Sequence, residues 1–503
     1  MYRFRALRRR LMLWSICTVV LVTALAAGGR LRTASAQPAS PSAAPGMARG
    51  IEWTSLRLLR DKGVLSEAEY ESAMADLDRF AANRDAATLV VSKLMATVYG
   101  FVQLDMAYNS TESCQESCSN AAIQKPGTYR GDHGRMVFSP RDSRFGIRFA
   151  AAEEHGIRTS ALLETDFFGP TSTTEQGTLT APVLRIRQAY LKLETPIVDV
   201  LVGQTWSLFG WQATYLVTSA QEPGYPGQLT QRSPQLRVSK TIATEVANLE
   251  MAVAAGRPPQ MDSAMPEWVA GVRALFPGWT GRHGNSLLPA AIAISGDLRR
   301  FRIAELAAAP GSGHVRTGGG VAVDGFLPII AATKQSQAHA LSIVGEAVVG
   351  AGTSDLYTAL GAAGTSNPSL PAASGDGQVV PYVPNYDPGL AAYDAAGRLE
   401  LIRWTSYMVG AEYVPPVLGG RLWTFANHGH MQSSNTHRFG GSAVMDPVAG
   451  RTRKSEDWYD AGMFVDLTGA TRVGTDVALY DDHYVDGTSA RNYSVMTTAY
   501  LFF

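Results

Sequence analysis

Arginines at alternate positions give this chain its clearest capacity for anion chemistry. Arg185 and Arg187 are two residues apart in residues 184–190, so on a β-strand both side chains point the same way. Guanidinium groups pair with carboxylates and phosphates through two hydrogen bonds at once. Three further arginines occur in alternating segments and would extend the pair into a basic ladder; they are Arg144, Arg148 and Arg158. The pattern predicts a wall that attracts anions.

Acidic residues occur in the same segments. Glu164 and Asp166 lie two residues apart, and Asp105 and Glu194 are in neighbouring segments. Acids that face a basic ladder across a narrow passage would create a field that orients polar solutes. A second interpretation stays open, in which these arginines and carboxylates only neutralise one another inside a wet interior.

The segments that carry these residues alternate with a period of two, which is typical of β-strands. Val102 and Leu104 alternate with Gln103 and Asp105, for example. Apart from the N-terminus, no apolar run reaches the ~18 residues of a membrane-spanning helix. Arg and Glu recur in mid-strand on one face only, as in a barrel with lipid outside and water inside. The prediction is an all-β fold, a transmembrane antiparallel β-barrel over residues 98–503 with a short N-terminal helical segment.

About sixteen such segments follow one another, an even number as bacterial barrels require. Their connections alternate between short turns and long loops, which favours a membrane barrel over a soluble sandwich. The predicted strands begin near Val98, Ser143, Ile157, Val183, Ile197, Pro234, Val246, Glu267, Pro289, Thr317, Ala338, Glu400, Gly419, Asp457, Thr471 and Arg491.

The N-terminus predicts export. Residues 1–36 combine a basic start, an apolar stretch over residues 11–27 and small residues at Ala34 and Ala36, which is the pattern of a cleaved signal peptide. Seven of the 44 basic residues lie there, so the remaining chain has 37 basic and 44 acidic residues, a net charge of −7. This balance gives no indication of nucleic-acid binding. Residues 37–50 are rich in Pro, Ala and Ser and are predicted to be a disordered linker.

Residues 51–97 are predicted to be a periplasmic helical segment. One short helix ends before Gly63, and a second begins at Ser66, with Glu69 completing a capping box. Helices this short need a partner, so we interpret the segment as a trimerisation stub. A loosely ordered leader is the alternative.

Cys114 and Cys118 are the cysteines that remain once Cys17 leaves with the signal peptide. Their spacing in an oxidising compartment favours a small disulfide loop. A metal site is the alternative, although no histidine lies close enough in the sequence to complete it.

Two clusters raise the question of catalysis or metal binding. Asp481, Asp482 and His483 form an acid–histidine group at a strand end, and His428 and His430 share one face of a strand. No opposing acidic pair or recognised motif accompanies them, so a turn and a loop-edge cluster are the favoured interpretations. We expect no enzyme activity, no metal and no cofactor.

Three stretches resemble a known family: residues 99–105, residues 184–190 and residues 201–207, which contain Gly-Gln-Thr-Trp-Ser. They are similar to the DcaP-like outer-membrane porins and, more generally, to the phosphate-selective porin O and P group. Gln188 departs from the family pattern, which has a basic residue there. The resemblance implies a trimeric diffusion channel for small anionic solutes, with Trp206 among its lining residues and residues 207–233 folded inward. An exposed cap is the alternative for those residues.

The chain ends on Phe503, after an aromatic-rich strand. This end resembles the signal by which Gram-negative outer-membrane barrels are recognised by the barrel-assembly machinery. The functional prediction is an outer-membrane porin for passive diffusion of small hydrophilic solutes, biased toward anions such as dicarboxylates. The alternatives are a plugged barrel for binding or adhesion, and a barrel hydrolase.

Overall fold

The computed structural model describes residues 88–91, 94–118, 122–169, 182–221, 224–260, 263–304, 311–334, 336–361, 389–394, 398–439 and 452–503. The predicted signal peptide, the linker and residues 51–87 of the predicted helical segment lie outside these ranges. The rest of that segment differs from the prediction, because β1 (Thr88–Val91) and the start of β2 (Leu94–Asn109) are extended. β-branched and apolar residues such as those of β1 favour strands.

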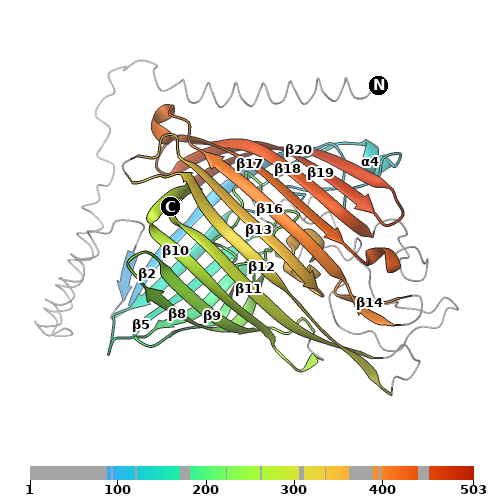
Figure 1. Cartoon of the computed structure of the whole chain (residues 1–503). Helices are drawn as coiled ribbons and strands as arrows, with labels where there is room; N and C mark the ends of the chain where they lie inside the picture. The colour runs from blue at the N-terminus through green and yellow to red at the C-terminus, as the bar shows by residue number, and fades with distance from the viewer. Residues whose placement is uncertain are drawn as a thin grey trace, which may run out of the picture. The chain divides into compact units, whose positions relative to one another are not determined.

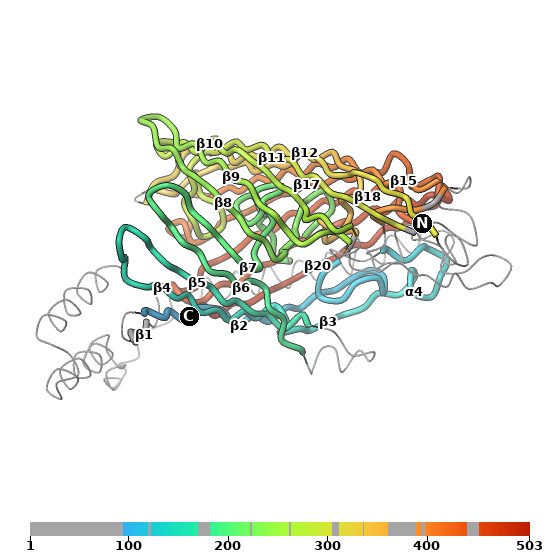
Figure 2. Tube along the Cα trace, turned by 90° about the horizontal axis from the view of Figure 1, so that it is seen from below, coloured from blue at the N-terminus to red at the C-terminus, as the bar shows by residue number. Residues whose placement is uncertain are grey.

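The described residues belong to two units. The smaller contains residues 88–91 and 94–99 with Ile147–Ala152 and Phe503, and the larger contains Gly100–Gly146 and Glu153–Phe502. The larger unit is an antiparallel barrel (Figures 1 and 2). Its remaining strands are β3 (Arg135–Ser139), β4 (Arg144–Ala151), β5 (Arg158–Asp166), β6 (Arg185–Glu194), β7 (Asp199–Trp206), β8 (Arg232–Ala243), β9 (Asn248–Gly256), β10 (Glu267–His283), β11 (Ser286–Ala304), β12 (Gly313–Ile330), β13 (Leu341–Ala351), β16 (Arg403–Tyr413), β17 (Leu422–Ser433), β18 (Arg453–Asp466), β19 (Thr471–Tyr484) and β20 (Ser489–Phe502).

The barrel closes where its first strand pairs with its last. The register between β2 and β20 runs from Phe101 opposite Phe502 to Asn109 opposite Ser494. The main sheet has eighteen segments among the described residues. β1 pairs only along the start of β2 and adds no position to the wall. β3 and β4 both pair with β2, so β3 and β4 together occupy one position. Sixteen wall positions remain, and the predicted strand number is confirmed.

Most predicted strand starts fall within a few residues of the observed ones. The second predicted strand, near Ser143, corresponds to β4, and β3 precedes it in residues that were not predicted to be a strand. The strand predicted from Glu400 begins at Arg403, because β15 (Leu399–Leu401) pairs instead with β14 (Ala391–Tyr393). The described helices are short: α4 (Tyr129–Asp132), α6 (Thr358–Gly361), η3 (Ser354–Leu356), η4 (Leu418–Gly420) and η5 (Thr436–Arg438). None of them is long and apolar enough to cross a membrane.

Side chains alternate between two faces of the wall. On β2, Val102 and Leu104 are exposed on the outer face, whereas Gln103 and Asp105 are buried on the inner face. Short turns join the strands at one end, as at residues 195–198, 244–247 and 467–470, and most connections at the other end are longer. In membrane barrels the short turns are periplasmic, which orients this wall.

Candidate functional site

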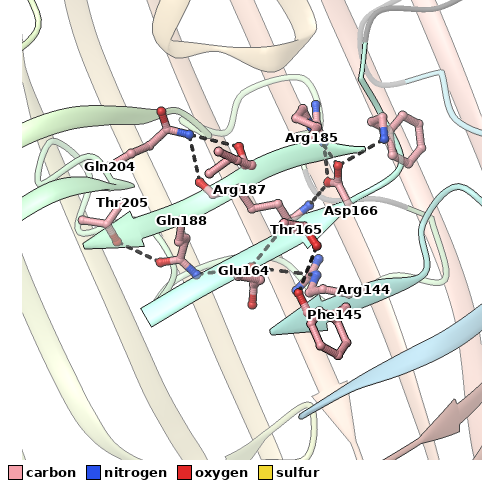
Figure 3. A network of polar contacts seen from close by, with 12 residues as sticks. Arg144, Phe145, Glu164, Thr165, Asp166, Arg185, Arg187, Gln188, Gln204 and Thr205 are labelled. Carbon is pink, nitrogen blue, oxygen red and sulfur yellow. Dashed lines mark hydrogen bonds and ion pairs between the residues drawn. The ribbon is translucent and has the colours of Figure 1, made fainter. Parts of the chain in front are cut away.

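The predicted anion-binding residues meet on the inner faces of β5 and β6. Leu163 and Ile186 are exposed on the outer face, so Glu164 and Arg187 beside them point inward. Figure 3 shows the group, with Arg185 and Arg187 directed at Glu164 and Asp166. The arginines and carboxylates that were predicted to lie on neighbouring strands are therefore in contact.

A β-bulge shapes this group. Glu164 is opposite Gln188, and the next residue, Thr165, is opposite Ile186. Arg187 is therefore the extra residue, and a bulge re-aims the side chains next to it. As a result Arg185, Arg187 and Gln188 all point inward, although strict alternation would separate Arg187 from Gln188. The position at which the family pattern has a basic residue thus holds an amide on the same face.

The ion pairs in this group are close. Arg185 makes a forked contact with Asp166, with Nε and Nη2 donating over 2.9 and 2.6 Å. Arg187 donates to Glu164 over 3.0 Å and to Asp166 over 2.6 Å. The Arg187 side chain is 3% exposed and that of Arg185 is 37% exposed. Arg187 thus holds the two carboxylates together, while Arg185 keeps an accessible edge.

Hydrogen bonds from amides and a hydroxyl complete the group. Gln188 Nε2 donates to Glu164 over 3.2 Å, and Thr205 Oγ1 donates to Gln188 Oε1 over 2.8 Å. Trp206, the next residue on β7, points to the face opposite Thr205, and the guanidinium of Arg232 lies 4.9 Å from its ring centre. Trp206 therefore does not share the inner face that was predicted for it.

The other ladder arginines have different surroundings. Arg144 lies 4.0 Å from Glu164 and 5.1 Å from the ring centre of Phe101. Arg158 pairs with Glu194 over 3.4 Å, and its side chain is 67% exposed. Arg148 belongs to the smaller unit, where its guanidinium lies 4.0 Å from the ring centre of Tyr99.

The loop after β7 folds into the barrel, as the resemblance implied. We call its described parts, residues 207–221 and 224–231, the inner loop. Its backbone reaches strands far from β7: Gly210 N donates to Ser295 on β11 over 2.9 Å, and Leu229 N donates to Glu346 on β13 over 2.6 Å. On β19, Asp476 accepts a hydrogen bond from Ser219 over 2.8 Å. Inward-facing carboxylates of the wall therefore hold the loop.

Glycines let the inner loop approach the wall. Gly227 has φ +90°, and a Cβ there would collide with the Tyr407 carbonyl of β16. A Cβ on Gly429 of β17 would likewise collide with the Pro226 carbonyl. Backbone lies directly against backbone at these two positions, which only glycine permits.

A second inner segment, residues 352–361, lies against the inner loop. Arg299 on β11 holds it through a forked contact with Asp355 at 2.6 and 2.7 Å. Leu356 O accepts a hydrogen bond from Thr230 N of the inner loop over 2.9 Å. Arg299 was not among the residues predicted from the sequence. Ser295, Asp297 and Arg299 do alternate with Gly296 and Leu298, which is the pattern of an inward-facing row on a strand.

The disulfide candidate and the catalytic candidates lie elsewhere. Cys114 and Cys118 are joined as a disulfide. Asp482 is fully buried and receives hydrogen bonds from Ile123 N and Arg453, whereas His483, the next residue, is exposed and points to the opposite face. Of the two acids in the catalytic candidate, Asp482 therefore points away from His483. Asp481 lies 3.8 Å from His483 Nε2, and it is also paired with Arg491 over 2.7 Å.

His428 and His430 lie on the outer face of β17. His430 Nδ1 is 2.8 Å from Asp457, and the His428 ring stacks on Tyr459 at 4.5 Å. Among the described residues, no group of three or more His, Cys, Asp or Glu side chains is arranged to hold a metal.

No protein-family model and no curated protein sequence matches the chain. Solved structures do resemble it. The outer membrane channel DcaP of Acinetobacter baumannii superposes with a TM-score of 0.59 at 17% identity, covering 83% of this chain and all of that one. The chain has the fold of an outer-membrane porin. A closed barrel with an apolar outer face also belongs in the outer membrane on physical grounds, because lipid cannot satisfy an open sheet edge.

More distant likenesses include an anion-selective porin from Comamonas acidovorans, with a TM-score of 0.48 at 12% identity, covering 82% of this chain and all of that one. The trimer form of OmpT, an outer membrane protein of Vibrio cholerae, has a TM-score of 0.44 at 10% identity and covers 83% of this chain and all of that one.

Proposed function

We propose that this protein is a porin, through which small hydrophilic solutes diffuse passively across the outer membrane with a bias toward anions such as dicarboxylates. The observation that carries the proposal is the inner-face group on β4, β5 and β6. Three arginines, Arg144, Arg185 and Arg187, lie beside two carboxylates, Glu164 and Asp166. The group keeps one net positive charge, and Arg185 is partly exposed to an entering anion.

The mechanism needs no catalytic residue. An anion enters by electrostatic steering, makes weak contacts with guanidinium donors, and leaves down its concentration gradient. The inner loop would set the width of the passage beside this group. We further propose that the chain works as a homotrimer, as the resemblance to DcaP-like porins implies.

Single-channel recording in a planar bilayer under a salt gradient tests the proposal. We expect stepwise openings that close in threes, with a reversal potential shifted toward that of the anion. Arg185→Ser removes the accessible positive charge and should shift the reversal potential toward the cation. Arg438→Ser is the control, since Arg438 is an exposed arginine paired with Glu400 near the long-loop end. A cation preference in the unmodified protein would refute the anion bias.

A plugged barrel for binding or adhesion is the second candidate. Phe209, Tyr225 and Leu229 of the inner loop are fully buried, as is Tyr357 of the second inner segment, and this packing favours a narrow interior. A folded protein that gives no openings in the bilayer would support the plugged barrel.

A further inference from the structure

The outer face of the wall carries an apolar hollow on β8–β12. Its volume is about 540 Å³, and nearly all of its lining is apolar. Ala270 on β10 and Gly296 on β11 are directly opposite in the register and form its floor. The large outer-face side chains around the floor are Val253, Trp268, Val272, Ile294, Leu298 and Val321.

The hollow results from the residue types at the floor. Several neighbouring outer-face residues on these strands are large, as in Ile292 and Val323, which are 57% and 45% exposed. At Gly296 a Cβ would meet nothing closer than the Gly320 carbonyl, at 3.7 Å. The backbone there does not require glycine, since no left-handed φ is recorded for this position. The gap is therefore open space that a larger side chain would fill.

One cation lines the hollow. Lys240 of β8 shares the outer face with Val238 and lies opposite Met251. It is near the short-turn end of β8, and its Nζ donates to the Pro196 carbonyl of the β6–β7 turn over 2.6 Å. A lysine that faces lipid destabilises a barrel strongly at the bilayer midplane and only slightly near the interface. Lys240 is therefore expected at the depth of the lipid headgroups of the periplasmic leaflet.

We propose that this hollow binds one anionic phospholipid of the periplasmic leaflet. The Lys240 ammonium would contact the lipid phosphate, while an acyl chain fills the space over Ala270 and Gly296. The ammonium matches the charge of the lipid phosphate, and the apolar groove beside it matches the acyl chain. The proposal rests on the location in the outer membrane and is independent of what passes through the barrel.

Native mass spectrometry of the full chain tests this site. The purified protein in detergent is mixed with phosphatidylglycerol or, separately, with phosphatidylcholine. We expect one phosphatidylglycerol retained per chain and about fivefold less phosphatidylcholine. Lys240→Gln should remove that preference, and Gly296→Phe, which fills the hollow, should remove retention of both lipids. Gly325→Phe is the control, because Gly325 is a glycine of β12 away from this lining.

Equal retention of the two lipids, or undiminished retention in Gly296→Phe, would overturn the proposal. If Gly296→Phe fails to fold, Ala270→Leu fills the same space and gives the same readout. If filling the hollow dissociates an oligomer and leaves lipid retention unchanged, a second copy of the chain occupies the hollow and the proposal is wrong.

Discussion

The rings of Tyr225 and Trp458 are stacked, with centroids 4.1 Å apart and planes 2° from parallel. Tyr225 belongs to the inner loop and Trp458 to β18, on a part of the wall far along the chain from β7. Both side chains are fully buried. This contact therefore fixes the inner loop across the interior of the barrel.

Replacing Tyr225 by Ala should release the inner loop. The change removes the stacking contact and leaves a cavity, at a cost of about 3–5 kcal/mol. We expect larger and noisier single-channel currents than in the unmodified protein. Tyr459→Ala is the control, since Tyr459 adjoins Trp458 but lies on the outer face and is 47% exposed. Unchanged currents in Tyr225→Ala would mean that the inner loop does not limit the passage.

Arg187→Gln should destabilise the barrel more than Arg185→Gln. Loss of Arg187 leaves Glu164 without its closest cation and Asp166 with one partner fewer, and both carboxylates are buried. Removing one partner of a buried ion pair costs about 3–5 kcal/mol. Arg185 is partly exposed, so water can replace it. Urea unfolding followed by tryptophan fluorescence measures both variants, and equal losses would contradict this ranking.

Reduction of the Cys114–Cys118 disulfide should loosen the long-loop end while the barrel stays folded. A ring this small contributes about 2 kcal/mol by restricting the unfolded chain. The bridge is buried, and Asn492 Nδ2 of β20 donates to Cys118 Sγ over 3.1 Å. We expect faster hydrogen exchange over residues 109–118 in Cys114→Ser/Cys118→Ser, with little change in β10–β13. Identical hydrogen exchange with and without the disulfide would show that packing alone keeps residues 109–118 ordered.

Acidification should open the contact between Lys125 and Asp486. Partial burial raises the pKa of Asp486, but hydrogen bonds from Lys125 and Thr488 outweigh it and hold the pKa at about 2. Because this pKa is below the unfolded value of about 3.9, the contact stabilises the fold above pH 4. That contribution is lost as the pH falls from about 4 through 2.

Hydrogen exchange over residues 122–134, corrected for intrinsic rates, measures this opening between pH 5 and pH 2. Asp486→Asn is the control, because it removes the titrating group and should abolish the pH response. High salt should weaken the effect as well, since both side chains are partly exposed. A response that persists in Asp486→Asn would assign it to another group.

The wall was predictable from sequence because its signal is local. Alternation such as that of Val102, Gln103 and Leu104 identifies a strand and both of its faces without knowledge of its neighbours. The same rule also gave the direction of Arg185. β3 was missed as a strand, although Pro140 and Asp142 after it are residues that interrupt strands and mark the break before β4.

The site was predictable only in part. Alternation predicted that Arg185 and Arg187 share one face of β6, but the bulge at Arg187 depends on cross-strand register, which a single strand does not encode. The contacts of the inner loop with Glu346 and Asp476 join residues more than a hundred positions apart. Only folding brings such residues together, so spacing in the sequence cannot identify them.

The pairing of β2 with β20 has a consequence for biogenesis. The seam joins the first wall strand to the last, so the ring cannot shut until the C-terminal strand has been synthesised and delivered. Ser219 contacts Asp476 on β19, next to that seam, so this contact of the inner loop also forms only after the last strands have been delivered. A chain truncated before Ser489 would keep two unpaired edges, which makes it a substrate for periplasmic proteases rather than a smaller channel.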